Sequence, residues 1–180
     1  MCAIVEGASI TEIIPRPKAM TIGDTQYPHN IFELWGAAEL KGLGIYPITV
    51  DNTNLKDNKY YKNTNITYTW DSDNETVTGA YGTATAQDLA SLKTSKKETI
   101  NGRANALLER YDWYTLRAAS GGTAIPSSVS TYQAAVRTKA NSMCTQIDGA
   151  ANVDALAALY VYNSDTPPVK PLGEWPSKPE

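Results

Sequence analysis

The sequence predicts an α+β protein. A small antiparallel β unit with one short helix precedes a helical hairpin, a third short helix and an extended Pro-rich tail. Apolar residues alternate with polar ones in the first half and recur at three- and four-residue steps after residue 85, and five prolines gather at the end. These three observations predict divisions at 1–84, 85–162 and 163–180.

The β half contains two predicted hairpins. Residues 2–6 and 9–14 are expected to pair across a tight turn in which Gly7 takes a positive φ. Residues 66–70 and 76–81 alternate β-branched and aromatic side chains on either side of a cluster of turn residues. Both patterns are typical of antiparallel pairs.

A short helix and a strand are expected between the two hairpins. Asn30 can cap a helix that runs to about Lys41, and Glu33 stands where a capping box needs it. Residues 45–50 alternate as a strand, and Pro47 is expected to break it because proline has no N–H to donate.

The remaining part of the β half is less regular. Residues 20–27 are expected to be extended, and the polar, Asn-rich residues 51–65 are expected to form a loop. The aromatic side chains of this half that could supply contact area in an oligomer are Tyr60, Tyr61 and Tyr81.

From residue 85 the hydrophobic period becomes helical. An amphipathic helix is predicted over about 85–111, with Thr85 as its cap and Asp88 three residues later. Leu107 and Leu108 end its apolar stripe, and we expect Leu108 to lie in the core. The pair Asp112-Trp113 marks a stop or a bend.

A second helix is predicted over about 128–147, after a flexible link at residues 120–122. Its stripe includes Val136 and Met143, and antiparallel packing on the first helix is the simplest arrangement. Asn152 is expected to cap a third, short helix.

Residues 163–180 are predicted to be extended and polyproline-like. Val169, Leu172 and Trp175 recur at the three-residue polyproline period, which brings them to one side. They either dock in an apolar groove, on a neighbouring subunit rather than on the same chain, or fold back on their own domain. The other three tryptophans are expected in the core: Trp35, Trp70 and Trp113.

Composition argues against several classes of partner. The formal net charge is -3 and no run of Lys and Arg exceeds two residues, which disfavours nucleic acid. No apolar run approaches the roughly 18 residues of a membrane span, and the first residues do not read as a signal peptide. The two cysteines, Cys2 and Cys144, are expected to be reduced and inert.

No motif predicts catalysis, a cofactor or a metal. His29 is the only histidine and reads as a loop or capping residue rather than a base. Asp71, Asp73 and Glu75 have a spacing that could hold calcium, but a hairpin turn explains them better. The glycines of residues 79–82 fit turn geometry and lack a phosphate-binding pattern.

Two regions resemble accessory structural proteins of tailed bacteriophages. Residues 1–54 contain YPHNIFELW followed by GIY, which is similar to the start of short phage tail proteins. Residues 106–143 contain ALLERYDWYTLRA and then STYQAAVRTKANSM, which resemble the C-terminal helical unit of tail-fibre and tail-fibre-assembly proteins. Gln133 and Val136 depart from the Arg and Leu of that pattern.

The resemblance implies a virion structural protein: a tail or fibre adaptor, or a fibre-associated subunit, made in the bacterial host cytoplasm. Its partners would be other tail proteins and copies of itself, with no nucleic acid, no membrane and no enzymatic activity. The alternative within the family is a tail-fibre assembly chaperone. A tail-borne polysaccharide hydrolase ranks last, because nothing in the sequence places the required pair of carboxylates.

Overall fold

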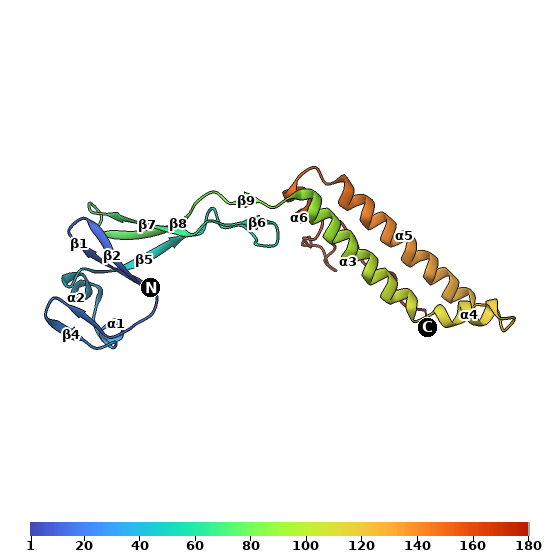
Figure 1. The fold of residues 1–180 in the computed structure, drawn as a ribbon, viewed down its shortest axis with the longest axis horizontal. Helices are drawn as coiled ribbons and strands as arrows, with labels where there is room; N and C mark the ends of the chain where they lie inside the picture. Colours follow the sequence, from blue (N-terminus) through green and yellow to red (C-terminus); the bar gives the residue numbers. More distant parts are fainter. Residues whose placement is uncertain (180) are drawn as a thin grey trace. The chain divides into compact units, whose positions relative to one another are not determined.

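The computed structural model describes residues 1–179 and divides the chain into two compact units, Met1–Thr85 and Ala86–Glu180. The first unit contains a sheet that is mostly antiparallel, and the second is helical, so the α+β class is confirmed (Figure 1). The division falls one residue beyond the predicted boundary at 84. The segment expected as a separate tail belongs to the helical unit.

The first unit is built on a five-stranded sheet with the strand order β2-β1-β5-β8-β7. The predicted hairpins are present as β1–β2 and β7–β8, and Gly7 has the expected positive φ of 64°. The bounds of the strands are β1 (Cys2–Glu6), β2 (Ser9–Ile14), β5 (Ile45–Asp51), β7 (Ile66–Asp71) and β8 (Thr76–Tyr81).

Strand β5 runs through Pro47, so the expected break is wrong. The first half of β5 pairs with β1, where Pro47 lies opposite Cys2, and the second half pairs with β8 from Ile48 onward. Ile48 donates its N–H to the Met1 carbonyl at 3.1 Å. Pro47 is tolerated because it stands where the strand changes its partner, and the β5–β8 pairing is parallel within an otherwise antiparallel sheet.

Two short helices, α1 (Ile31–Leu34) and α2 (Ala37–Gly42), replace the single helix expected after Asn30. Trp35 is extended, with φ -92° and ψ 142°, and Gly36 donates its N–H to the Glu39 carboxylate at 2.7 Å. This bond starts a new helix. Asn30 makes no side-chain cap bond, so the predicted capping box with Glu33 is wrong.

Residues 20–27 form a small hairpin of β3 (Met20–Ile22) and β4 (Thr25–Tyr27), which turns at Gly23 with a positive φ of 57°. The other short strands are β6 (Tyr61–Lys62), inside the expected loop, and β9 (Thr85–Ala86).

The sheet has apolar side chains on both faces. One cluster contains Ile4, Ile14, Ile31 and Ile45, with side chains of α1, α2 and the β3–β4 hairpin packed against it. The other contains Ala3, Val5 and Val77. Trp35 and Trp70 pack at the margins of these clusters and are half-buried rather than enclosed.

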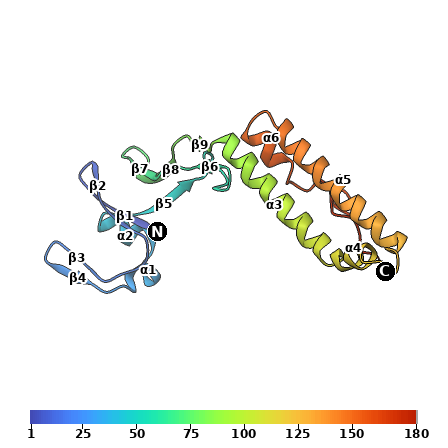
Figure 2. The same ribbon diagram turned by 45° about the vertical axis from the view of Figure 1, so that its right-hand side comes forward.

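The second unit is a helical hairpin in which α3 (Leu89–Glu109) and α5 (Ser127–Gly149) lie side by side and antiparallel (Figures 1 and 2). The predicted hairpin is therefore confirmed. Asp88 caps α3 by accepting from the Ser91 N–H at 2.8 Å. The expected cap at Thr85 is wrong, because Thr85 belongs to β9 and α3 begins only at Leu89. Asn152 caps the short α6 (Val153–Ala158) by accepting from Ala155 at 2.8 Å, as expected.

The core of this unit lies along the facing stripes of the two long helices. Leu107 belongs to it, with 7% of its surface exposed, whereas Leu108 is half-buried. The expectation for Leu108 is therefore wrong, because Ile100, Ala104 and Leu107 set the stripe at steps of four and three. The α5 side contributes Val129, Tyr132, Gln133, Val136, Ala140, Met143 and Ile147.

Candidate interaction surfaces

An additional helix, α4 (Asp112–Ala119), begins at the predicted stop or bend and ends just before the predicted link at residues 120–122. Asp112 stands in its first turn and Arg117 in its last, where each charge complements the helix dipole. Trp113 is 49% exposed and Leu116 is 68% exposed. The expectation that Trp113 lies in the core is wrong, because α4 directs it away from the α3–α5 contact.

The Trp113 ring belongs to a preformed stack. Its centre lies 3.8 Å from that of Tyr114, and the Arg117 guanidinium lies 4.9 Å from the centre of Trp113 and 5.1 Å from that of Tyr114. We call Trp113, Tyr114, Leu116 and Arg117 the α4 cluster. Cation–π contacts of this kind hold exposed rings in place.

Arg117 also joins α4 to the segment that follows it. Its Nε donates to the Thr123 carbonyl at 3.3 Å and one terminal nitrogen donates to the Ala124 carbonyl at 3.4 Å. Gly122 donates its N–H to the Arg117 carbonyl at 3.0 Å. A Cβ at Gly122 would come within 2.8 Å of the Arg117 Cγ, so this close approach requires glycine.

Tyrosines connect the α4 cluster to the core. Tyr111 lies 6.5 Å from Tyr114 and 5.3 Å from Tyr132, measured between ring centres. Tyr132 is 5% exposed, and its buried hydroxyl has no hydrogen-bond partner among residues 1–179. Burial raises the pKa of Tyr132. The exposed stack therefore stands on a rigid, buried aromatic base.

The Pro-rich tail folds back on its own helical unit, and the preference for docking on a neighbouring subunit is wrong for Leu172. Leu172 is only 2% exposed and donates its N–H to the Leu159 carbonyl at 3.1 Å. Trp175 is half-buried, and Val169 is 47% exposed. The three residues expected on one side are thus separated. No helix or strand forms over 163–179, as expected.

Exposed apolar side chains also gather where the tail begins. Val161 is 63% exposed and Tyr162 is 51% exposed, and with Val169 they line a shallow groove of about 540 Å³. Lys170 donates to the Tyr162 hydroxyl at 3.1 Å and pairs with Glu174 at 3.0 Å, and Tyr162 donates to the same carboxylate at 2.9 Å. These three contacts hold Tyr162, Lys170 and Glu174 together, and we call this bonded start of the tail its root.

The three tyrosines predicted as contact area in the β unit differ in burial. Tyr60 is only 7% exposed, and burial is the main cause that raises its pKa, with the charge of Asp57 second. It is too enclosed to offer surface to a partner, so that prediction is wrong for Tyr60. Tyr61 and Tyr81 are half-buried, and their role in contacts stays a prediction.

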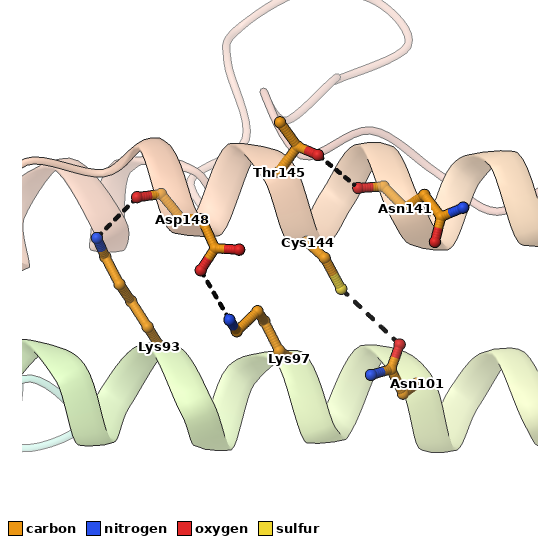
Figure 3. A network of polar contacts seen from close by, with 7 residues as sticks. All are labelled: Lys93, Lys97, Asn101, Asn141, Cys144, Thr145 and Asp148. Carbon is orange, nitrogen blue, oxygen red and sulfur yellow. Dashed lines mark hydrogen bonds and ion pairs between the residues drawn. The ribbon is translucent and has the colours of Figure 1, made fainter.

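Polar contacts join the two long helices near their α6 end (Figure 3). Lys93 donates to the Asp148 carbonyl at 2.8 Å, and Lys97 pairs with the Asp148 carboxylate at 2.8 Å, which raises the pKa of Lys97. The Cys144 thiol donates to Asn101 at 3.8 Å, and burial raises its pKa, so the thiol stays protonated. Both cysteines are free.

The acidic residues considered for calcium act as turn residues. The Asp71 carboxylate accepts from the backbone of Asp73 at 3.0 Å and from the Asn74 side chain at 2.8 Å, and the Asn74 side-chain bond is the main cause that lowers the pKa of Asp71. Glu75 pairs with Lys41 instead. Over residues 1–179, no group of three or more metal-binding side chains gathers, and His29 is exposed.

Comparison with protein-family models, curated proteins and solved structures found no significant match. None of the helices within the described residues is both long and apolar enough to cross a membrane. The surface features above are therefore interpreted from the chain itself.

Sequence reasoning missed α4 and its cluster, although a signal was present. Trp113 and Leu116 stand three residues apart, and Asp112 and Arg117 have the charge order of a helix. The sequence predicted that the first long helix ends at residues 111–113, but these residues begin α4.

Proposed function

We propose that the chain is a virion structural protein of a tailed bacteriophage, a tail or fibre adaptor or a fibre-associated subunit that acts through protein–protein contacts. The proposal rests on the resemblance of residues 1–54 and 106–143 to such proteins. It gives the chain a place in the virion tail, with other tail proteins and copies of itself as partners and with no catalytic step of its own.

The observation that supports this proposal most strongly is the position of the α4 cluster. The cluster lies within ALLERYDWYTLRA, the segment that carries the more specific part of the resemblance, and Trp113 belongs to its Asp-Trp pair. A residue that resembles a family motif and is 49% exposed is unsuited to a role in the core of the isolated chain. Its exposure favours a role in contacts.

The chemistry of the cluster suits a protein partner. Trp, Tyr and Arg are the residue types that dominate the energetics of protein interfaces. Trp113, Tyr114 and Arg117 are already stacked on one another, so little side-chain freedom is lost when a partner covers them. Leu116 adds apolar area beside the stack.

Quantitative mass spectrometry of purified particles tests the proposal. A virion subunit is expected at a fixed number of copies relative to the other tail proteins. A tail-fibre assembly chaperone would be abundant in the infected-cell lysate and absent from purified particles. That second result would reject the virion role and favour the chaperone.

A further inference from the structure

The end of the tail lies in a groove on the first turns of α5. Ser128, Tyr132 and Ala135 line this groove from the helix, and Pro176, Ser177 and Pro179 line it from the tail. About 390 Å³ of open space remains between them. We call residues 174–179 the arm, and the arm therefore occupies the groove without filling it.

Over residues 163–179, backbone hydrogen bonds hold the tail in place before Gly173 but not after it. Before it, Asn163 donates its N–H to the Val169 carbonyl at 2.8 Å, and Gly173 donates to Lys170 at 2.9 Å. Within the described part of the chain, no backbone hydrogen bond fastens the arm. Gly173 itself has a φ of 75°, which makes it suited to a change of chain direction. Release of the arm from α5 therefore breaks no backbone hydrogen bond of residues 1–179: it costs the side-chain contacts of Glu174 with Tyr162 and Lys170, whereas the backbone bonds before Gly173 remain.

While the arm lies in the groove, one buried polar atom has no hydrogen-bond partner among the described residues, and the carboxylate that makes the side-chain bonds of the arm is exposed. The buried Tyr132 hydroxyl on the groove helix has no hydrogen-bond partner, which is unfavourable. The Glu174 carboxylate, which accepts from Tyr162 and Lys170, is exposed, so water can replace these bonds at little cost. Neither feature strongly opposes release of the arm.

We propose that the arm exchanges between two copies of this chain, so that residues 174–179 of one copy occupy the α5 groove of the other. Each contact made within one chain is available between two, which makes exchange of an identical segment an inexpensive route to a symmetric dimer. A proline-rich arm is already extended, so it loses little freedom on docking.

Charge and shape select this occupant over an unrelated peptide. The Lys139 ammonium of α5 is among the charges that lower the pKa of Glu174, and the end of its side chain lies beside Gly173, whose φ of 75° favours glycine. These two features favour a segment in which a carboxylate directly follows a residue that accepts a positive φ. A second copy supplies this with Glu174, the first residue of its arm, and the preceding Gly173.

Disulfide trapping with the full-length chain tests the exchange. In a background with Cys2→Ser and Cys144→Ser, one variant carries Ala135→Cys in the groove and another carries Ser177→Cys in the arm. The two are mixed, oxidised and separated without reductant. Exchange predicts a covalent heterodimer of twice the 19.5 kDa chain mass.

The matched control replaces Ala135→Cys with Ala134→Cys, an exposed position next to the groove residue on the same helix. Exchange also predicts that light scattering shows a concentration-dependent dimer that is lost when residues 174–180 are deleted. A heterodimer yield equal to the Ala134→Cys control, with a monomeric mass at all concentrations, would overturn the proposal. The inference goes beyond the phage role, since purified chain alone decides it.

Discussion

The Arg117 guanidinium lies 4.9 Å from the centre of the Trp113 ring, four residues before it on the same short helix. This contact keeps an exposed tryptophan ordered, and the bonds from Arg117 to the carbonyls of Thr123 and Ala124 extend that order to the following segment. The stack is thus built into the α3–α5 connection and does not depend on a partner to form.

Trp113→Ala is expected to separate folding from assembly. The side chain is half exposed, so we expect the unfolding free energy to fall by only about 1 kcal/mol. Incorporation into particles should fall at least about tenfold if the residue anchors an interface. Chemical denaturation and quantitative mass spectrometry of particles measure the two effects.

Leu55→Ala is the matched control for that substitution, because Leu55 is 42% exposed, lies in the other unit and stands outside the residues that carry the resemblance. It should leave both readings unchanged. Equal incorporation of the Trp113→Ala and Leu55→Ala variants would remove the α4 cluster from the proposal.

Two glycine substitutions should have opposite effects on the helical unit. Gly102 lies inside α3 with open space around its Cβ position, so Gly102→Ala should stabilise by about 0.5–1 kcal/mol. Gly122→Ala should destabilise, because its Cβ would meet the Arg117 side chain and carbonyl at 2.8 and 2.9 Å. Thermal melts of both variants would show shifts of opposite sign, and a stabilised Gly122→Ala variant would contradict the close approach.

Leu172→Ala should cost about 2–5 kcal/mol, the range for emptying a buried leucine site. Deleting the tail from residue 164 should therefore lower the melting temperature of the isolated protein. Val169→Ala, at a position that is 47% exposed, is the control and should change stability by less than about 1 kcal/mol. A deletion that leaves the melt unchanged would show that the tail is not part of this core.

Leu107→Ala should be more damaging than Leu108→Ala. Leu107 is 7% exposed and lies on the stripe that faces α5, so about 2–5 kcal/mol is expected, whereas half-buried Leu108 should lose less. Urea denaturation of the two variants compares them directly. The reverse order would place the α3–α5 contact on a different face of α3.

The closed root of the tail should loosen in acid. The bond from Lys170, followed by that from Tyr162, lowers the pKa of Glu174 below its ordinary value of 4.5. The stabilisation is therefore fully present above pH 4.5 and is lost as the pH falls through the lowered value. Tail resonances in NMR spectra should report this transition, and Glu174→Gln should abolish it.

Periodicity predicted the parts of the fold that are long and locally consistent. The alternation of residues 66–70 and 76–81 and the helical stripe of Val136 and Met143 correspond to β7, β8 and α5. In these segments, local preference and tertiary packing favour the same structure. The cap residue Asn152 was found for the same reason, whereas the cap of α3 is Asp88 and not Thr85.

The errors arise where tertiary contacts decide between local alternatives. Pro47 is accepted because β5 changes partner at the next residue, which no local pattern shows. Leu172 is buried because the tail returns to the Leu159 carbonyl, a contact that polyproline periodicity does not encode. Trp113 was expected in the core because it stands at the end of a periodic segment, but it lies on α4 and is 49% exposed.

A high-resolution reconstruction of the phage particle tests the central claim most directly. We expect density for this chain in the tail, with Trp113 and Leu116 of α4 covered by another virion protein or by a second copy. A particle that lacks the chain, or one in which the α4 cluster faces solvent on every copy, would contradict it.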